Sequence, residues 1–110
     1  MKIIYKRLKT KSGGEQDVLY VPDRCVILHN LDLDTYLYSP KEDWLRKYGK
    51  VKGKIESEIE VDETEIKKLI DIGEIYIDPR GRIHDIDDME FRELFNSLIP
   101  RQFLKLNYPK

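Results

Sequence analysis

The chain contains no alanine, although alanine is normally among the commonest residues of globular proteins. Amide side chains are also scarce, since three asparagines and two glutamines stand against 13 lysines, 13 isoleucines and 10 glutamates. Abundant lysine and glutamate with few thermolabile amides is typical of proteins from hyperthermophiles. We therefore expect a thermophilic source, either a cell or one of its viruses.

Cysteine and long apolar runs are nearly absent. The single cysteine, Cys25, excludes an internal disulfide, as is usual in a reducing compartment. The longest purely apolar run covers residues 25–28, which is far too short to span a membrane. The first residues lack the apolar stretch of a signal peptide. These absences predict a soluble intracellular protein of the cytoplasm, or of the host cytoplasm if the source is a virus.

The chain also lacks an excess of charge of one sign. Lysine and arginine number 20 and aspartate and glutamate 21, which gives a formal net charge of -1. The charges are nevertheless segregated into blocks along the chain. In the folded protein these blocks either mix both signs over a solvated surface or form a basic end and an acidic end that orient a binding surface. The net charge is +5 over residues 1–11, -4 over 12–40, +4 over 41–54, -9 over 55–90 and +3 over 91–110.

The first thirty residues are typical of β-strands. The predicted strands are residues 2–9, 17–21 and 24–29. Ser12-Gly13-Gly14 is a turn signal that joins the first two strands into an N-terminal hairpin. The third run is apolar and rich in β-branched residues, which predicts a buried strand. Residues 31–34 either continue this strand or form a loop.

Two helices are predicted in the middle of the chain from their start and stop signals. Ser39 serves as the N-cap of the first helix, with Pro40 at its first position and Gly49 as its left-handed C-cap. Asp62 opens the second helix in the same way, and Gly73 ends it.

A third helix is predicted to begin at residues 87–90. Asp87 is expected to cap it, Asp88 favours its N-terminus through the helix dipole, and Pro100 stops it. Its apolar residues recur at helical spacing and predict a buried stripe. The stripe comprises Phe91, Leu94, Phe95 and Leu98.

Residues 74–86 predict a second hairpin. Its turn is Asp78-Pro79-Arg80-Gly81, with proline and glycine at the positions that a type I turn favours. Residues 103–108 predict a last edge strand. Because strands and helices mix without regular βαβ alternation, we predict a single α+β domain over residues 1–110. Its mainly antiparallel sheet is expected to pack with three short helices.

Residues 50–61 alternate strictly between charged and apolar or small side chains, which predicts an amphipathic strand, with a helix as the alternative. The charged row changes from lysine to glutamate halfway, so an antiparallel copy centred on Ile55 would place opposite charges face to face. We therefore predict a homodimer through this strand, unless the strand pairs within its own sheet. The dimer residues are Lys50, Lys52, Lys54, Ile55, Glu56, Glu58 and Glu60.

The N-terminal hairpin is a candidate nucleic-acid surface, because basic residues there surround Tyr5. The tip of the 74–86 hairpin adds two arginines in the place of a winged-helix wing, although the helix before it is acidic and would repel phosphate. Lysines on an edge strand also guard against aggregation, which is the alternative reading. The basic residues of this surface are Lys2, Lys6, Arg7, Lys9, Lys11, Arg80 and Arg82.

Aromatic residues gather between residues 36 and 48 and predict a protein-binding surface. Tyrosine and tryptophan commonly anchor interfaces, although Trp44 and Tyr48, together with Leu45, would also pack the first helix onto the sheet. The residues of this surface are Tyr36, Tyr38, Trp44 and Tyr48.

Histidine and aspartate supply the only metal-ligand candidates. Two aspartates spaced two apart face the same way on a strand, and carboxylates with a histidine hold Mg²⁺ or Mn²⁺ for phosphodiester hydrolysis. Chance placement is the alternative, because the chain has 11 aspartates. Cys25 lies in an apolar run and is expected to pack in the core rather than react. The candidate ligands are His29, Asp32, Asp34, His84 and Asp85.

These features favour a binding function over catalysis. The first prediction is a non-enzymatic protein that acts through a protein partner, such as a regulator or a viral inhibitor. The alternative is a nucleic-acid-binding protein that uses the basic hairpin, and the third hypothesis is a metal-dependent nuclease. We assign no catalytic residue and no cofactor.

Overall fold

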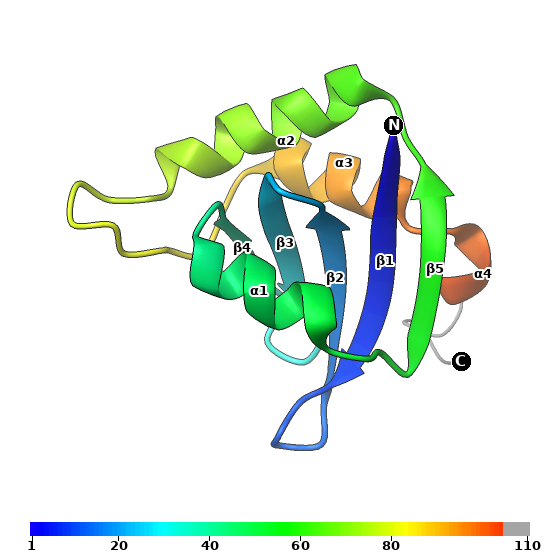
Figure 1. The fold of residues 1–110 in the computed structure, drawn as a ribbon. Helices are drawn as coiled ribbons and strands as arrows, with labels where there is room; N and C mark the ends of the chain where they lie inside the picture. Colours follow the sequence, from blue (N-terminus) through cyan, green and yellow to red (C-terminus); the bar gives the residue numbers. More distant parts are fainter. Residues whose placement is uncertain (105–110) are drawn as a thin grey trace.

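Five strands form one antiparallel sheet in the order β4-β3-β2-β1-β5 (Figure 1). The computed structural model describes residues 1–104, with Leu104 described by its backbone alone. The strands are β1 (Lys2–Lys9), β2 (Glu15–Val21), β3 (Cys25–Asn30), β4 (Thr35–Ser39) and β5 (Ile55–Glu60). The first four strands form a meander, whereas β5 returns from farther along the chain to pair with β1.

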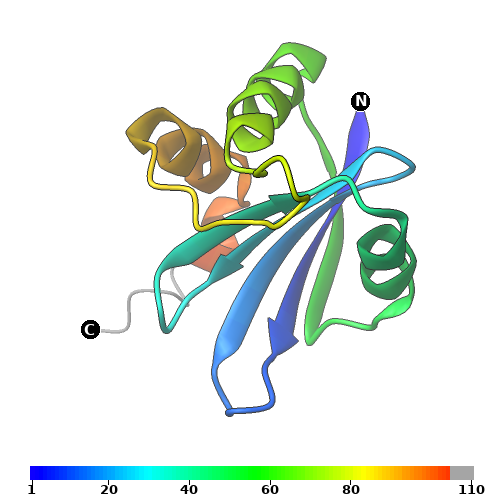
Figure 2. The same cartoon turned by 90° about the vertical axis from the view of Figure 1, so that its left-hand side faces the viewer.

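Helices cover both faces of this sheet, as Figures 1 and 2 show. On one face lies α1 (Glu42–Lys50), and on the other lie α2 (Glu63–Ile75), α3 (Met89–Leu98) and the short α4 (Arg101–Leu104). Side chains alternate along each strand, so Tyr5 and Leu19 face α2 and α3 while Leu8 and Val18 face α1. The predicted α+β fold is therefore confirmed. Among residues 1–104, no helix has the length and apolar character that a membrane crossing requires.

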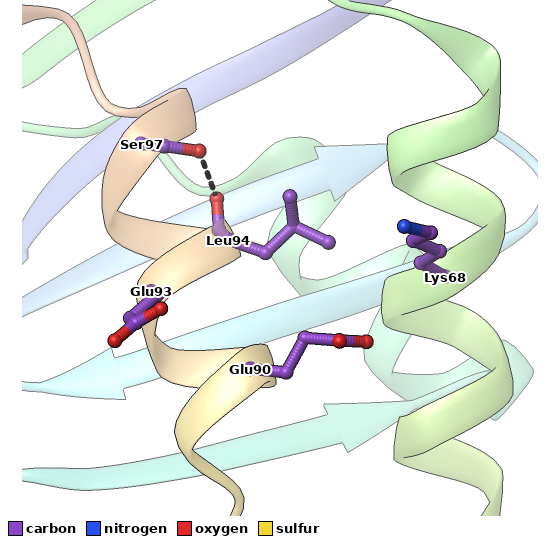
Figure 3. Close-up of a pocket in the computed structure, with 5 residues that line it drawn as sticks. All are labelled: Lys68, Glu90, Glu93, Leu94 and Ser97. Carbon is purple, nitrogen blue, oxygen red and sulfur yellow. Dashed lines mark hydrogen bonds between the residues drawn. The ribbon is translucent and has the colours of Figure 1, made fainter.

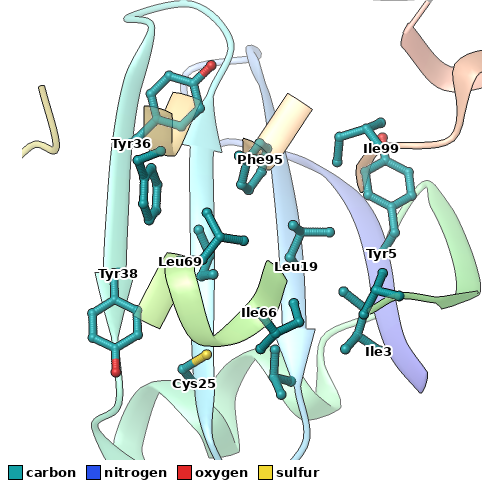
Figure 4. Packing of buried hydrophobic residues seen from close by; sticks show 14 of the residues in the cluster. Ile3, Tyr5, Leu19, Cys25, Tyr36, Tyr38, Ile66, Leu69, Phe95 and Ile99 are labelled. Carbon is teal, nitrogen blue, oxygen red and sulfur yellow. The ribbon is translucent and has the colours of Figure 1, made fainter. Parts of the chain in front are cut away.

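The larger core lies beneath α2 and α3, and Figure 4 shows part of it. Phe91 and Phe95 of α3 are fully buried, and the other two residues of the predicted stripe, Leu94 and Leu98, pack against this core in part. Cys25 is also fully buried, as predicted. Burial raises the pKa of its thiol to about 12, so the sulfur stays protonated and unreactive at neutral pH.

Two of the three expected helix starts are close to those observed. Asp62 caps α2, where its carboxylate accepts a hydrogen bond from the Thr64 amide at 2.8 Å. In α3 the capping carboxylate belongs to Asp88, which accepts from the Phe91 amide at 2.8 Å. The assignment of Asp87 as that cap was wrong by one residue, because the helix begins at Met89 and its N-cap position therefore falls at Asp88.

The expected ends of α1 were wrong. The Ser39 hydroxyl accepts a hydrogen bond from the Lys41 amide in a turn before the helix, so α1 begins at Glu42 without a side-chain cap. At its other end α1 continues through Gly49 to Lys50. Gly49 is therefore a helical residue, and a buried lysine described below replaces the expected glycine cap.

Gly73 does not end α2, which continues to Ile75. The residue is buried, and a Cβ at this position would lie 2.5 Å from Cγ of Tyr38. Glycine is required here because the helix backbone packs directly on the Tyr38 ring of β4. Gly73 was predicted to be a helix stop because a helix C-cap and a close approach of the backbone both select glycine, and the sequence alone does not distinguish the two.

The 74–86 hairpin is much shorter than predicted. Its turn closes as expected, because the Gly81 amide donates to the Asp78 carbonyl at 2.8 Å, but only Ile77 and Ile83 form a bridge. The predicted edge strand over 103–108 was wrong at its start, since residues 103 and 104 belong to α4. Residues 105–108 of that prediction lie outside the described part of the chain.

Candidate functional site

The alternating segment 50–61 forms a strand only over Ile55–Glu60, where it becomes β5. Lys50 lies in α1, and residues 51–54 form a link rather than an extended strand. Within the chain β5 pairs with β1, which places Lys6 opposite Glu56. A dimer centred on Ile55 needs residues 50–54 as a strand, so that register does not exist in this structure.

Glutamates that were expected to pair with lysines of a second copy pair instead with lysines of β1 in the same chain. Lys2 Nζ lies 3.4 Å from Glu58 Oε1, and Lys6 Nζ lies 3.5 Å from Glu56 Oε1. The lysine row of β1 and the glutamate row of β5 therefore neutralise each other. This pairing removes the charge complementarity on which the homodimer hypothesis rested.

Two of the basic residues expected on a nucleic-acid surface are buried. Lys6 and Arg7 are 1 % and 0 % exposed, so neither contacts a phosphate. Arg7 Nε and Nη2 donate to the two carboxylate oxygens of Asp17 at 2.8 and 3.1 Å. The Tyr5 hydroxyl donates to the same carboxylate at 2.8 Å, and burial together with Asp17 raises its pKa above the ordinary value.

Lys6 fixes the end of α1. Its Nζ donates to the carbonyl oxygens of Tyr48 at 2.7 Å, Val51 at 2.8 Å and Gly49 at 3.4 Å. The last carbonyls of a helix lack intrahelical donors, and a cation there also matches the negative end of the helix dipole. The buried ammonium therefore ties the end of α1 and the following link to β1.

A groove opens where these segments meet. The ends of β1 and α1 and the β1–β2 turn lie at the lower end of the sheet in Figure 1. The volume of the groove is about 600 Å³. One side is the end of β1 with the β1–β2 turn, and the opposite side is the end of α1 with the link to β5. The groove is lined by Leu8, Lys9, Thr10, Lys11, Gln16, Lys47, Tyr48, Val51, Lys52 and Lys54. We call this the basic groove.

Positive charge dominates the basic groove, because half of its ten lining residues are lysines and none is acidic. Lys54 Nζ lies 3.9 Å from Glu15 Oε2 at the rim. Within residues 1–104, the other four lysines have no carboxylate in salt-bridge range. Four uncompensated ammonium groups around one recess create a local positive potential despite the near-zero net charge of the chain.

The floor of the basic groove is apolar and rigid. Leu8 and Tyr48 belong to the smaller core under α1, and Val51 packs against it. Burial raises the pKa of the Tyr48 hydroxyl, so the ring adds no negative charge. Gly53 lets the link pass close to β1, because a Cβ there would lie 3.1 Å from the Arg7 carbonyl oxygen.

Sequence reasoning found part of this site. Lys9 and Lys11 belong to the predicted nucleic-acid surface, and both line the groove. Lys47 was missed, and Lys52 and Lys54 were assigned to the dimer strand. The available signal was the net charge of +4 over residues 41–54, but nothing in the sequence placed that block beside the N-terminal hairpin.

Arg80 and Arg82 lie apart from the basic groove. Arg80 belongs to the 78–81 turn and Arg82 follows it, in the loop after α2 that projects at the far left of Figure 1. Arg82 Nε lies 3.6 Å from the Asp78 carboxylate. The structure therefore does not join these arginines to the basic hairpin in one surface.

The aromatic residues expected to bind a partner are mostly core residues. Tyr36 and Tyr38 are each 2 % exposed, and their hydroxyls are held by Asn96 and Glu74. Trp44 packs with Tyr48 at 6.0 Å between ring centroids, in agreement with the packing alternative. Tyr36 and Tyr38 are thus corrected from surface anchors to core residues, since the strand that carries them was not recognised.

The candidate metal ligands are held in separate pairs. His29 Nε2 lies 2.8 Å from Asp34 Oδ1, whose pKa is lowered by that hydrogen bond and by Arg92. Asp32 and Asp34 lie in the β3–β4 turn rather than on one strand face.

The second pair is equally separate, since His84 Nε2 lies 3.1 Å from Asp78 Oδ2. Asp85 instead accepts a hydrogen bond from the Tyr36 amide at 2.9 Å. In the described part of the chain, no three histidine, cysteine, aspartate or glutamate side chains come together to hold a metal ion.

A second hollow lies between α2 and α3 (Figure 3). Its volume is about 290 Å³, half that of the basic groove. Lys68 faces it from α2, whereas Glu90 and Glu93 line it from α3. The mixed charge and small size give this hollow no evident ligand.

Comparison of the chain with known protein families, with curated protein sequences and with solved structures finds no match.

Proposed function

We propose that this protein binds nucleic acid in the basic groove and acts by binding rather than by catalysis. The observation that carries the proposal is the cluster of five lysines around a recess with no acidic lining residue. Phosphate contacts by lysine and arginine supply most of the affinity of proteins for nucleic acid, because they release condensed counterions. The proposal keeps Lys9 and Lys11 from the predicted hairpin surface and adds three lysines from the α1 side.

The lining of the basic groove favours binding over chemistry. Besides the lysines it offers the hydroxyls of Thr10 and Tyr48 and the amide of Gln16. The described lining includes no histidine, cysteine or carboxylate, the groups that most often serve as general bases or nucleophiles. Lysine and amide groups in a recess are sufficient to hold phosphates and sugars.

Near-zero net charge does not oppose this proposal, because the acidic segments lie elsewhere. Most of the acidic residues between 62 and 90 belong to α2 and the loop after it, which lie on the other face of the sheet from α1. At physiological ionic strength charges are screened beyond about 8 Å. A phosphate at the groove therefore experiences the nearby lysines more strongly than the distant acids.

The test is fluorescence anisotropy with labelled DNA, in both single- and double-stranded form, over a series of salt concentrations. Replacing Lys11 and Lys52 by glutamine removes one charge from each side of the groove without breaking any ion pair. For whichever form binds, we expect weaker binding and a salt slope smaller by roughly 0.7–0.9 for each lost contact.

The matched control is the double substitution Lys67→Gln and Lys68→Gln on α2. It removes the same charge from the opposite face, so affinity and salt slope are expected to stay at the parent values. Equal losses in the two double variants would show a response to net charge alone and would contradict a site at the groove.

A protein partner, the first hypothesis from the sequence, stays a prediction. Two of its four proposed anchors, Tyr36 and Tyr38, are core residues that are 2 % exposed, and the small exposed part of a third, Tyr48, lies in the basic groove. The hypothesis has therefore lost most of the separate surface that it predicted. An acidic partner protein would also fit the basic groove, and the experiment below distinguishes it from nucleic acid.

A further inference from the structure

We infer that the ligand of the basic groove is a single strand of nucleic acid and that a duplex is excluded. This inference rests on the proposed function and specifies its ligand. It depends on three features of the structure: the placement of lysines on facing sides of a recess, the size of that recess, and its apolar floor.

The lysines surround a recess rather than spread over an open face. Lys9 and Lys11 stand on the hairpin side, whereas Lys47, Lys52 and Lys54 stand on the α1 side and the link. A chain of phosphates lying between these sides is within reach of ammonium groups from both. The phosphates of a duplex lie on a wide convex cylinder, which reaches the rim of such a recess and not its interior.

The size of the recess agrees with one strand. A volume of about 600 Å³ is in the range of small-molecule sites and holds only a few nucleotides. Proteins that read duplex DNA insert a helix or a two-stranded ribbon into the major groove. The β1–β2 turn projects beside this site (Figure 1), and insertion of that turn into a major groove would leave the three lysines on the α1 side without phosphates.

The apolar floor suits unpaired nucleotides. Leu8, Tyr48 and Val51 lie beneath the lysines, and the Tyr48 hydroxyl has no hydrogen-bond partner within residues 1–104. Proteins that bind single strands combine a positive groove for the backbone with aromatic side chains on which the bases stack, and Tyr48 is the aromatic residue of this floor. A duplex stacks and pairs its bases internally, so it would leave this floor without a contact.

The test compares ligands that present the same chemistry in different forms. Labelled oligo(dT) of about 12 nucleotides, a site size typical of single-strand binders, is titrated beside its duplex with oligo(dA), inorganic tripolyphosphate and poly-glutamate of similar charge. We expect the single strand to bind at least about tenfold more tightly than each of the others. Its salt slope should not exceed about 3.5, the value for five phosphate contacts.

Each other outcome has a distinct meaning. Equal or tighter binding of the duplex overturns this inference and leaves the proposed function standing. Tripolyphosphate as tight as the oligonucleotide overturns it in favour of a small polyanion, and poly-glutamate as tight as the oligonucleotide points to an acidic protein. If neither nucleic acid binds, the proposed function itself fails.

Discussion

Gly73 shows how one missing side chain positions a helix. Replacing glycine by alanine inside a helix normally stabilises it by about 0.5–1 kcal/mol. Here the new Cβ would lie 2.5 Å from Cγ of Tyr38, a ring atom close to the β4 backbone that cannot move alone. We expect Gly73→Ala to lower the free energy of unfolding by about 1–3 kcal/mol, the usual range for overpacking. Urea denaturation monitored by circular dichroism measures this change in the free energy of unfolding.

Gly49→Ala is the control for that substitution. Gly49 is also helical, but the atom nearest to its new Cβ is the Tyr20 hydroxyl oxygen at 2.8 Å, at the end of a mobile side chain. Gly49→Ala should therefore cost less than Gly73→Ala. A stabilised Gly73→Ala variant would mean that α2 does not pack on Tyr38 as described.

Cys25 gives stability a dependence on alkaline pH. Burial holds the pKa of its thiol at about 12 in the folded protein, above the value of about 8.5 in an unfolded chain. A raised pKa contributes stability that is full below the unfolded value and is lost as pH rises toward the folded value. Between pH 8.5 and 10 the loss reaches at most about 2 kcal/mol, because one pKa unit corresponds to about 1.4 kcal/mol.

The measurement compares urea unfolding of the parent and Cys25→Val at neutral pH and near pH 10. Tyr5 and Tyr38 also have raised pKa values, so both proteins are expected to weaken in alkali, but the parent should weaken more. An identical pH dependence would show that the thiol ionises equally in folded and unfolded chains.

At the scale of elements, the buried ammonium of Lys6 joins α1 to β1. In Lys6→Met the carbonyls of Tyr48, Gly49 and Val51 lose their donor, and an unsatisfied buried polar group costs about 1–3 kcal/mol. Hydrogen exchange should show that α1 amides lose protection while α2 amides change only with global stability.

Lys2→Met serves as its control on the same strand. Lys2 is exposed and its contact with Glu58 is a surface ion pair, which contributes at most about 1 kcal/mol. If the two variants lose equal stability with the same exchange pattern, Lys6 is not the cap of α1.

Elements defined by local patterns were predictable, whereas those defined by distant partners were not. The alternation over residues 55–60 and the cap at Asp62 identify β5 and the start of α2, because both signals lie within a few residues. β4 was missed, since its alternating tyrosines read equally well as interface anchors. The burial of Lys6 depends on the carbonyls at the end of α1, which no local pattern places beside β1.

The two sides of the basic groove could be predicted only as separate basic segments, because distant parts of the chain form them. Each side is a basic segment that is visible in the sequence, one at residues 9–11 and one at 47–54. Their union follows from the pairing of β1 with β5, which draws the link after α1 alongside β1. That pairing also places Lys2 and Lys6 in ion pairs with Glu58 and Glu56, whereas sequence reasoning had assigned both lysines to a nucleic-acid surface.

At the scale of the whole molecule, a charge-reversing variant distinguishes two hypotheses about residues 50–61, a homodimer strand and one side of the basic groove. The homodimer hypothesis expects Lys52→Glu with Lys54→Glu to convert dimers into monomers. The structure places both lysines at the basic groove, so we expect the parent and this variant to have the same mass by light scattering, that of a single chain. The same variant should lose nucleic-acid binding. A dimeric parent that dissociates in the variant would restore the dimer hypothesis.

The strand order also sets a sequence of events for a chain that is still being made. β1 to β4 pair through short turns, so the meander forms from neighbours as soon as residue 39 is available. The outer edge of β1 must wait for β5, about fifty residues later, and closing that long loop costs more entropy. During this interval an unpaired edge is exposed, and the lysines along it oppose pairing with another chain. Lys2 and Lys6 of β1, which later pair with glutamates of β5, thus first protect the unfinished sheet from aggregation.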